Sequence, residues 1–87
     1  MFTLKTKRSA LRKLAIIGNS QKQKIREVLL TLKNDPIPFK KADGCKLKGY
    51  DNIYRIRIGS LRLVYEILWN EKVILIHYVG PREKAYE

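Results

Sequence analysis

The chain has 87 residues, enough for one domain with a single hydrophobic core and too few for two. Its hydrophobic fraction of 45% is ordinary for a folded domain and argues against a disordered chain. Nineteen Lys and Arg residues against eight Asp and Glu give a formal net charge of +11, and so strong a positive field favours a polyanionic partner: RNA, DNA, an anionic membrane or an acidic protein.

The cysteine count and the lengths of the apolar segments indicate the cellular compartment of the protein. Cys45 is the only cysteine, so no disulfide can form within the chain, and a reducing environment is indicated. No segment approaches the roughly 18–20 apolar residues of a membrane span. Lysines and arginines interrupt the N-terminal segment, where a secretory signal needs an apolar stretch. We therefore expect a single domain over residues 1–87, in the cytoplasm and without a membrane partner.

The N-terminal half predicts a strand and then a helical hairpin. Residues 2–6 alternate apolar and polar side chains, as a short strand does. A helical spacing of apolar residues follows, and Gly18 can end that helix in the left-handed conformation. Ser20 and Gln23 fit the capping box of a second helix, which must end before Pro36 because proline disfavours a helical residue ahead of it.

The C-terminal half changes to a period of two, which is typical of strands. Residues 35–44 contain two prolines and a glycine and are expected to form a loop. Strands rich in β-branched and aromatic residues are expected at 53–58, 61–69 and 72–79, with a shorter one within 45–50. The predicted fold class is α+β: an N-terminal strand and a two-helix hairpin packed on one face of a twisted antiparallel sheet of about four to five strands.

The first hairpin would bring arginines together. If Gly59 and Ser60 form a two-residue turn, Arg57 directly faces Arg62, and Arg55 lies diagonal to Arg62 on the same face. Like charges at opposed positions destabilise a sheet, so folding alone gives no reason for this arrangement. A bound anion would remove the repulsion, and the guanidinium fork suits two-point contact with phosphate oxygens.

Two further residues bear on this cluster. Arg82 follows the last predicted strand and could reach the same end of the sheet. Glu66 is expected on the same face and could neutralise one of the arginines. A phosphate site is therefore the favoured interpretation, and a solvated exposed face with one ion pair is the alternative.

The second predicted hairpin determines which side chains of the last strand lie on each face of the sheet. A turn at Asn70 and Glu71 would set His77 opposite Val64 and Val79 opposite Arg62. Alternation then places His77 on the arginine side. The side chains expected to face the helices are those of Tyr54, Ile56, Ile58, Leu63, Tyr65, Ile67, Ile74, Ile76 and Tyr78.

RNA can be cut without a metal when its own 2′-hydroxyl attacks the adjacent phosphorus. The reaction needs a base, cations for the charge that develops on the phosphate oxygens, and an acid for the leaving 5′-oxygen. Arginines supply the cations and not the base, because they stay protonated. His77 is the single histidine, which excludes a two-histidine ribonuclease, and a lone histidine in an apolar strand is usually structural. The other titratable candidates are Lys84 and Tyr86, and no ligand cluster predicts a metal or another cofactor.

An ordered set of motifs in the C-terminal half resembles the RelE/ParE toxin superfamily. The motifs are Leu-Lys-Gly at 47–49, Tyr-Arg-Ile-Arg-Ile-Gly at 54–59, Leu-Arg-Leu-Val-Tyr at 61–65, Val-Gly-Pro-Arg at 79–82, and Tyr86. The superfamily pattern runs L-x-G, Y-R/K-I-R/K, Y-R-L-V-Y, V-G-x-R and a following tyrosine. The match covers most of residues 47–86, and the N-terminal half agrees in its strand and helix-pair layout.

The resemblance implies a toxin of a toxin–antitoxin pair. RelE-like members enter the ribosomal A site and cleave the messenger by 2′-hydroxyl attack, and a helical antitoxin wraps them. The expected partners are therefore mRNA on the ribosome, rRNA and a cognate antitoxin. The matched catalytic positions are Arg57, Arg62, Arg82 and Tyr86, and the predicted RNA- and phosphate-binding positions are Arg55, Lys48, Lys84 and His77.

The sequence departs from the family pattern in ways that leave the general base open. Some RelE members carry lysines at the positions of Arg55 and Arg57, and one of those lysines serves as the base there. Leu61 stands where an aromatic residue often precedes the arginine. The alternatives are a ParE-like inhibitor of DNA gyrase, a non-catalytic RNA- or ribosome-binding protein, and a relative that binds only its antitoxin.

Overall fold

The computed structural model describes residues 1–37, 43–46, 49 and 51–81, without the side chains of residues 43–45. Chain order in these ranges is strand, two helices, then four strands. The elements are β1 (Thr3–Thr6), α1 (Arg8–Ile16), α2 (Asn19–Asn34), β2 (Asp43–Lys46), β3 (Ile53–Ile58), β4 (Leu61–Leu68) and β5 (Val73–Gly80).

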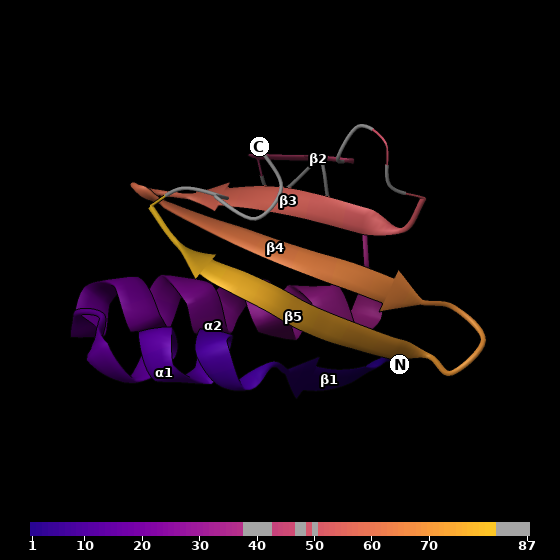
Figure 1. Cartoon of the computed structure of the whole chain (residues 1–87), viewed down its shortest axis with the longest axis horizontal. Coiled ribbons are helices and arrows are strands. Elements are labelled where there is room, and N and C mark those ends of the chain that lie inside the picture. The colour runs from indigo at the N-terminus through magenta and orange to yellow at the C-terminus, as the bar shows by residue number, and fades with distance from the viewer. Residues whose placement is uncertain (38–42, 47–48, 50, 82–87) are drawn as a thin grey trace.

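All five strands belong to one sheet, in the order β1-β5-β4-β3-β2. Figure 1 shows β1 at the lower edge of this sheet and α2 passing behind it. The pairs β2–β3, β3–β4 and β4–β5 are antiparallel, as expected for consecutive strands joined by short connections. The α+β class is confirmed with one refinement: β1 is an edge strand that runs parallel to β5, so the sheet is mixed.

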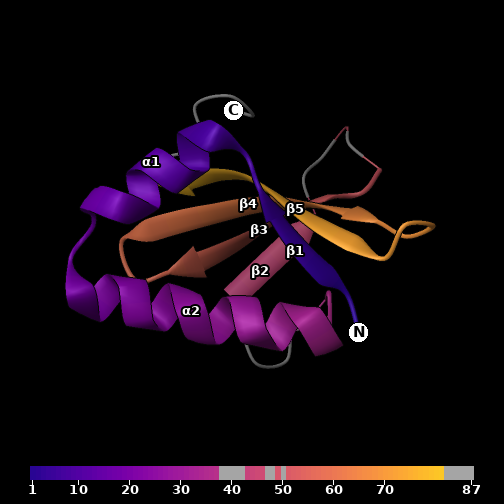
Figure 2. The same ribbon diagram turned by 90° about the horizontal axis from the view of Figure 1, so that it is seen from below.

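The core lies between one sheet face and the two helices. Alternate residues of β3, β4 and β5 are buried there, among them Ile56, Tyr65 and Ile76, none of which is exposed at all. Helix α1 packs against β5, and α2 contacts β1 and β3. Ala10 of α1 and Ile25 of α2 join the same apolar cluster, and Figure 2 shows the two helices as a hairpin joined at one end.

The junction between the helices differs from the expectation. Gly18 has φ −65° and ψ 157°, so it is extended and not left-handed. Helix α2 begins directly after it at Asn19, and Ser20 lies inside the first turn, so the predicted capping box is wrong. The Gly18 carbonyl accepts a hydrogen bond from the Lys22 amide at 2.9 Å, which fixes the helix start without a side-chain cap. The predicted end before Pro36 is confirmed, since α2 ends at Asn34.

Tyr65 ties the sheet to the segment after α2. Its hydroxyl donates a 2.7 Å hydrogen bond to the Pro36 carbonyl, and its ring stacks on Tyr54 with centroids 5.8 Å apart. Burial raises the pKa of Tyr65 well above its ordinary value, with smaller contributions from the nearby Tyr54 and Asp35. The phenol therefore stays protonated in the folded state.

Tyr65→Phe is expected to lower the free energy of unfolding by about 1 kcal/mol, since it leaves the Pro36 carbonyl without this donor. For a domain of this size the loss corresponds to a melting temperature lower by about 4–8 °C. The raised pKa makes the unfolded phenol ionise first, so wild-type stability falls above about pH 10 and the variant lacks this fall. Thermal melts at neutral and alkaline pH test both; a stability gap that stays constant or widens above that pH would contradict the assignment.

Candidate functional site

Three arginines lie on the sheet face opposite the helices, which we call the open face. The β3–β4 register pairs Arg57 with Arg62 and Arg55 with Val64, as the sequence predicts. Gly59 in the intervening turn has φ +60°, a conformation that glycine adopts without strain. Arg57 is exposed, and Arg55 and Arg62 are partly buried. We call Arg55, Arg57 and Arg62 the arginine cluster.

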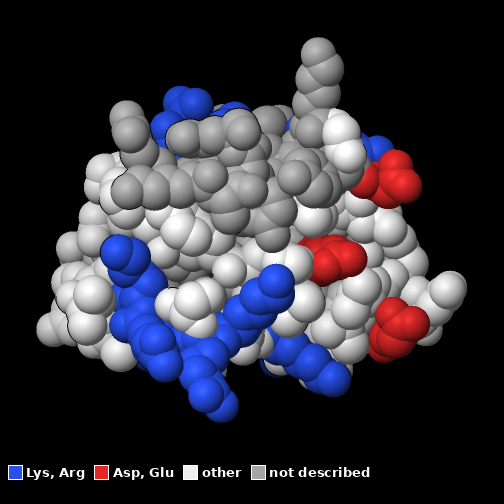
Figure 3. Space-filling view, viewed as in Figure 1, with Lys and Arg blue, Asp and Glu red and all other residues white. Residues whose placement is uncertain are grey.

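The charge around this cluster is strongly positive. The cluster lies at the end of the sheet where β3 turns into β4, and helix α1, which carries three basic residues and no acidic one, lies at that same end in Figure 1. In the same view Figure 3 shows Lys and Arg side chains gathered over α1, with the Asp and Glu side chains toward the opposite end of the sheet. The field of the described surface therefore favours an anion at the cluster end.

The β4–β5 pairing contains an irregularity that the sequence pattern does not predict. Tyr65 pairs with Ile76 but the preceding Val64 pairs with Tyr78, so His77 is an extra residue in β5, as in a β-bulge. The predicted pairs of Val64 with His77 and of Arg62 with Val79 are therefore wrong; Arg62 pairs with Gly80.

The bulge also changes which side chains share a face. The extra residue shifts the alternation, because two residues of β5 then span one step of β4. Val79 pairs with Leu63 and lies in the core. The register predicted from the sequence had placed it opposite Arg62, on the open face. Tyr78, which was expected to face the helices, instead lies on the open face opposite Val64.

His77 has a partner within the sheet. Its Nε2 atom lies 2.8 Å from Glu66 Oε1, with 9% of the His77 side chain and 29% of the Glu66 side chain exposed. From the sequence, Glu66 is a possible partner of an arginine, and His77 is a predicted RNA-binding residue. The observed pair joins His77 to Glu66 on the open face, and the RNA-binding role of His77 stays a prediction.

We expect His77→Ala and Glu66→Ala each to lower the free energy of unfolding by about 1 kcal/mol through loss of this bond. The double variant should be less destabilised than the sum of the two single variants, because the His77–Glu66 bond can be lost only once. Denaturant unfolding of wild type, the two single variants and the double variant measures the coupling energy between His77 and Glu66. Strictly additive losses would show that the contact contributes nothing to stability.

Two residues of the open face, Tyr78 and Gly80, are not predicted as site residues by the sequence. A Cβ atom at Gly80 would lie 2.8 Å from Cζ and 3.3 Å from Cε2 of the Tyr78 ring, so the end of this ring lies directly over the Gly80 backbone. Gly80 is in turn the cross-strand partner of Arg62. The only sequence signal was the pair of polar residues His77-Tyr78 inside an apolar strand.

Four predicted site residues, Lys48, Arg82, Lys84 and Tyr86, lie outside the described residues. Within the described ranges, no group of three or more His, Cys, Asp and Glu residues is placed to hold a metal ion. Within the same ranges, no helix is long and apolar enough to cross a membrane.

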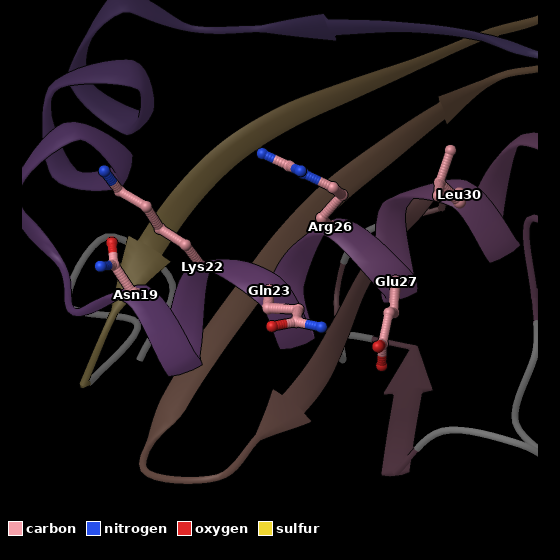
Figure 4. Close-up of a pocket in the computed structure, with 6 residues that line it drawn as sticks. All are labelled: Asn19, Lys22, Gln23, Arg26, Glu27 and Leu30. Atoms are coloured by element: carbon pink, nitrogen blue, oxygen red, sulfur yellow. The ribbon is translucent and has the colours of Figure 1, made fainter.

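A hollow along α2 offers no competing site. Its lining comes from that one helix, at Asn19, Lys22, Gln23, Arg26, Glu27 and Leu30. Figure 4 shows Lys22 and Arg26 pointing to one side of the helix and Gln23 and Glu27 to the other. Because these polar groups do not converge, the hollow lacks the arrangement that would grip a small ligand.

Comparisons with known proteins agree along nearly the whole chain. A family model described as the ParE toxin of the type II toxin-antitoxin system parDE matches residues 4–86. A protein of Methanocaldococcus jannaschii named "Putative toxin RelE1" is 38% identical over 86 residues, which cover 99% of this chain and 96% of that protein.

Solved structures show the same fold. The archaeal RelE-RelB complex from Pyrococcus horikoshii contains a chain with 28% identity and a TM-score of 0.84, covering 95% of this chain and 97% of that one. A chain of the intact E. coli RelBE toxin-antitoxin complex superposes with a TM-score of 0.82 at 23% identity, covering 97% of this chain and all of that one, which is a likeness of fold.

Proposed function

Because the chain belongs to the RelE/ParE superfamily and is a RelE-like toxin of a type II toxin–antitoxin system, we propose that it is a ribosome-dependent endoribonuclease. Its substrate in this proposal is messenger RNA in the ribosomal A site, and the nucleophile is the 2′-hydroxyl next to the scissile phosphate. A cognate antitoxin would neutralise it, as the complexes of RelE relatives with RelB suggest.

The observation that carries the proposal is the directly opposed pair Arg57 and Arg62, with Arg55 beside them on the open face. Attack on phosphorus places additional negative charge on the non-bridging oxygens. Fixed guanidinium groups stabilise this charge without having to reorganise during the reaction. The register supplies such groups from two neighbouring strands, at the spacing of about 4.5–5.5 Å between Cβ atoms that opposed residues have.

Proton transfer needs other residues. The arginine cluster cannot supply the base, because guanidinium groups stay protonated. His77 is paired with Glu66, and this proposal gives it no part in the proton transfer. In this proposal Lys84 or Tyr86 accepts the proton of the 2′-hydroxyl, and Arg82 stabilises the phosphate or donates a proton to the leaving oxygen. The roles of Tyr86 and Arg82 follow from the family resemblance, and Lys84 is included because its amine can titrate.

The decisive experiment adds the purified protein to ribosomes programmed with a defined messenger and maps the new 3′ ends. Cleavage within the A-site codon, dependent on the ribosome, is the expected result. A 2′,3′-cyclic phosphate at the new ends would identify the 2′-hydroxyl as the nucleophile. If the protein binds the ribosomes but leaves the messenger intact, it is a non-catalytic RNA-binding protein and not an enzyme.

Inhibition of DNA gyrase is the second candidate, because the matching family model describes a ParE toxin. A supercoiling assay with purified gyrase separates the two proposals. A ribonuclease leaves supercoiling intact, whereas a gyrase inhibitor blocks supercoiling and leaves the messenger whole. The arginine cluster on the open face favours the ribonuclease.

A further inference from the structure

The ring of Tyr78 occupies a place that exists only because residue 80 is glycine. Its end lies over the Gly80 backbone, where a Cβ atom would be 2.8 Å from Cζ. Side chains do not pack this closely, so any other residue at position 80 would displace the ring. Gly80 itself is buried and its φ is not positive, so its role here is to leave space and not to adopt a special conformation.

The bulge at His77 brings this ring beside the arginine cluster. Without the extra residue, alternation would turn Tyr78 toward the helices. With it, Tyr78 pairs with Val64, whose other neighbour across the sheet is Arg55. The phenol end extends along β5 to Gly80, the partner of Arg62. Tyr78 therefore lies beside Arg62, and one strand separates it from Arg55.

We propose that Tyr78 is an RNA-binding residue of this surface, whose ring stacks on the base of a nucleotide next to the phosphate held by the arginine cluster, and that Gly80 holds the ring in place. This inference rests on the proposed RNA-cleaving function and names a contact with its substrate. Tyr78 is partly exposed, as a stacking residue must be, whereas Tyr54 and Tyr65 are buried in the core.

The chemistry of a sheet surface supports this assignment. An aromatic ring on an open sheet face stacks on unpaired bases in several classes of RNA-binding domain. Stacking accepts any base, because every base has an aromatic face. Cations that bind phosphate and a ring that binds a base together fit single-stranded RNA, whose phosphates and bases are both accessible.

The test measures single-turnover cleavage on programmed ribosomes over a range of protein concentrations. Tyr78→Ala should raise the half-saturating concentration by about 5-fold to 150-fold, which corresponds to the loss of about 1–3 kcal/mol when one stacked base loses its aromatic partner. Tyr78→Phe keeps the ring and should stay within about twofold of wild type, since stacking does not need the hydroxyl. A Phe variant as impaired as the Ala variant would overturn stacking, because the hydroxyl would then be the active group.

Gly80→Ala gives an independent test at a residue that offers RNA no side chain. It should impair cleavage much as Tyr78→Ala does, by displacing the ring. The double variant should be no worse than Tyr78→Ala alone, because the ring is then already absent. Additive losses would overturn the link between the two residues. Leu75→Ala, on the same strand at a partly buried position opposite Glu66, is the matched control and should leave half-saturation unchanged.

Failure of the two proposals can be told apart. If wild type cleaves and Tyr78→Ala cleaves equally well, only the stacking proposal fails. If wild type cleaves no messenger, the proposed function fails, and binding of a five-nucleotide 2′-O-methyl RNA, followed by fluorescence anisotropy, decides the role of Tyr78. Weaker binding by Tyr78→Ala but not by Leu75→Ala would support the contact, and equal binding would overturn it.

Discussion

Arg62→Ala is expected to lower the single-turnover rate of messenger cleavage by about 10²- to 10³-fold, the usual loss when one fixed donor to a developing oxyanion is removed. Arg62 stands directly opposite Arg57 and beside Gly80, at the centre of the arginine cluster and its neighbours. The loss should appear in the rate at saturating protein, because the charge that Arg62 stabilises is largest in the transition state. Quench-flow or manual time courses on programmed ribosomes give this rate.

Arg26→Ala is the matched control for this prediction. It removes the same charge from an exposed position on α2, which passes behind the sheet. The cleavage rate of Arg26→Ala should equal that of wild type. Any general effect of the lost charge on binding is measured separately, by repeating the assay at several salt concentrations. Arg62→Ala should keep the fold, because it removes one of two opposed like charges. If Arg62→Ala cleaves the messenger as fast as wild type, the arginine cluster does not stabilise the transition state.

A messenger with a single 2′-deoxynucleotide on the 5′ side of the cleaved bond should resist the toxin almost completely. The proposed nucleophile is absent from this substrate, and none of the described residues of the arginine cluster can replace it. We expect cleavage to fall by more than about 10³-fold, since the remaining route would need attack by unactivated water. Denaturing gels of end-labelled messenger measure the residual cutting.

Binding provides the control for the deoxy substrate. The phosphates are unchanged, so the toxin should bind ribosomes carrying either messenger with the same affinity. A deoxynucleotide one codon downstream should have no effect on cleavage at the A site. Undiminished cutting of the deoxy messenger would exclude the 2′-hydroxyl as nucleophile and would point to activated water instead.

The first hairpin shows what local pattern can predict. Gly59 and Ser60 allowed one short turn, and a short turn fixes the register of the strands it joins. The pairing of Arg57 with Arg62 followed from that and is confirmed. The end of α2 before Pro36 was equally predictable, since proline acts on the residue next to it.

The second hairpin shows what the local sequence pattern cannot predict. The turn itself was located correctly, and Leu68 pairs with Val73 as predicted. The bulge at His77, eleven residues beyond Glu66 in the chain, depends on how β5 fits between β4 and β1 and on the bond between His77 and Glu66. Tyr78 was consequently assigned to the wrong face. A register error of one residue changes the face of every residue after it.

The sequence by itself determined the α+β class, the strongly basic character and the opposed arginines on β3 and β4, because each follows from composition, periodicity or one short turn. Only the tertiary structure decided that β1 joins the sheet beside β5 and that Tyr78 lies over Gly80 on the open face. The physical reason is range: contacts within a hairpin are set by neighbouring residues, whereas strand order and bulges minimise the energy of the whole packed sheet.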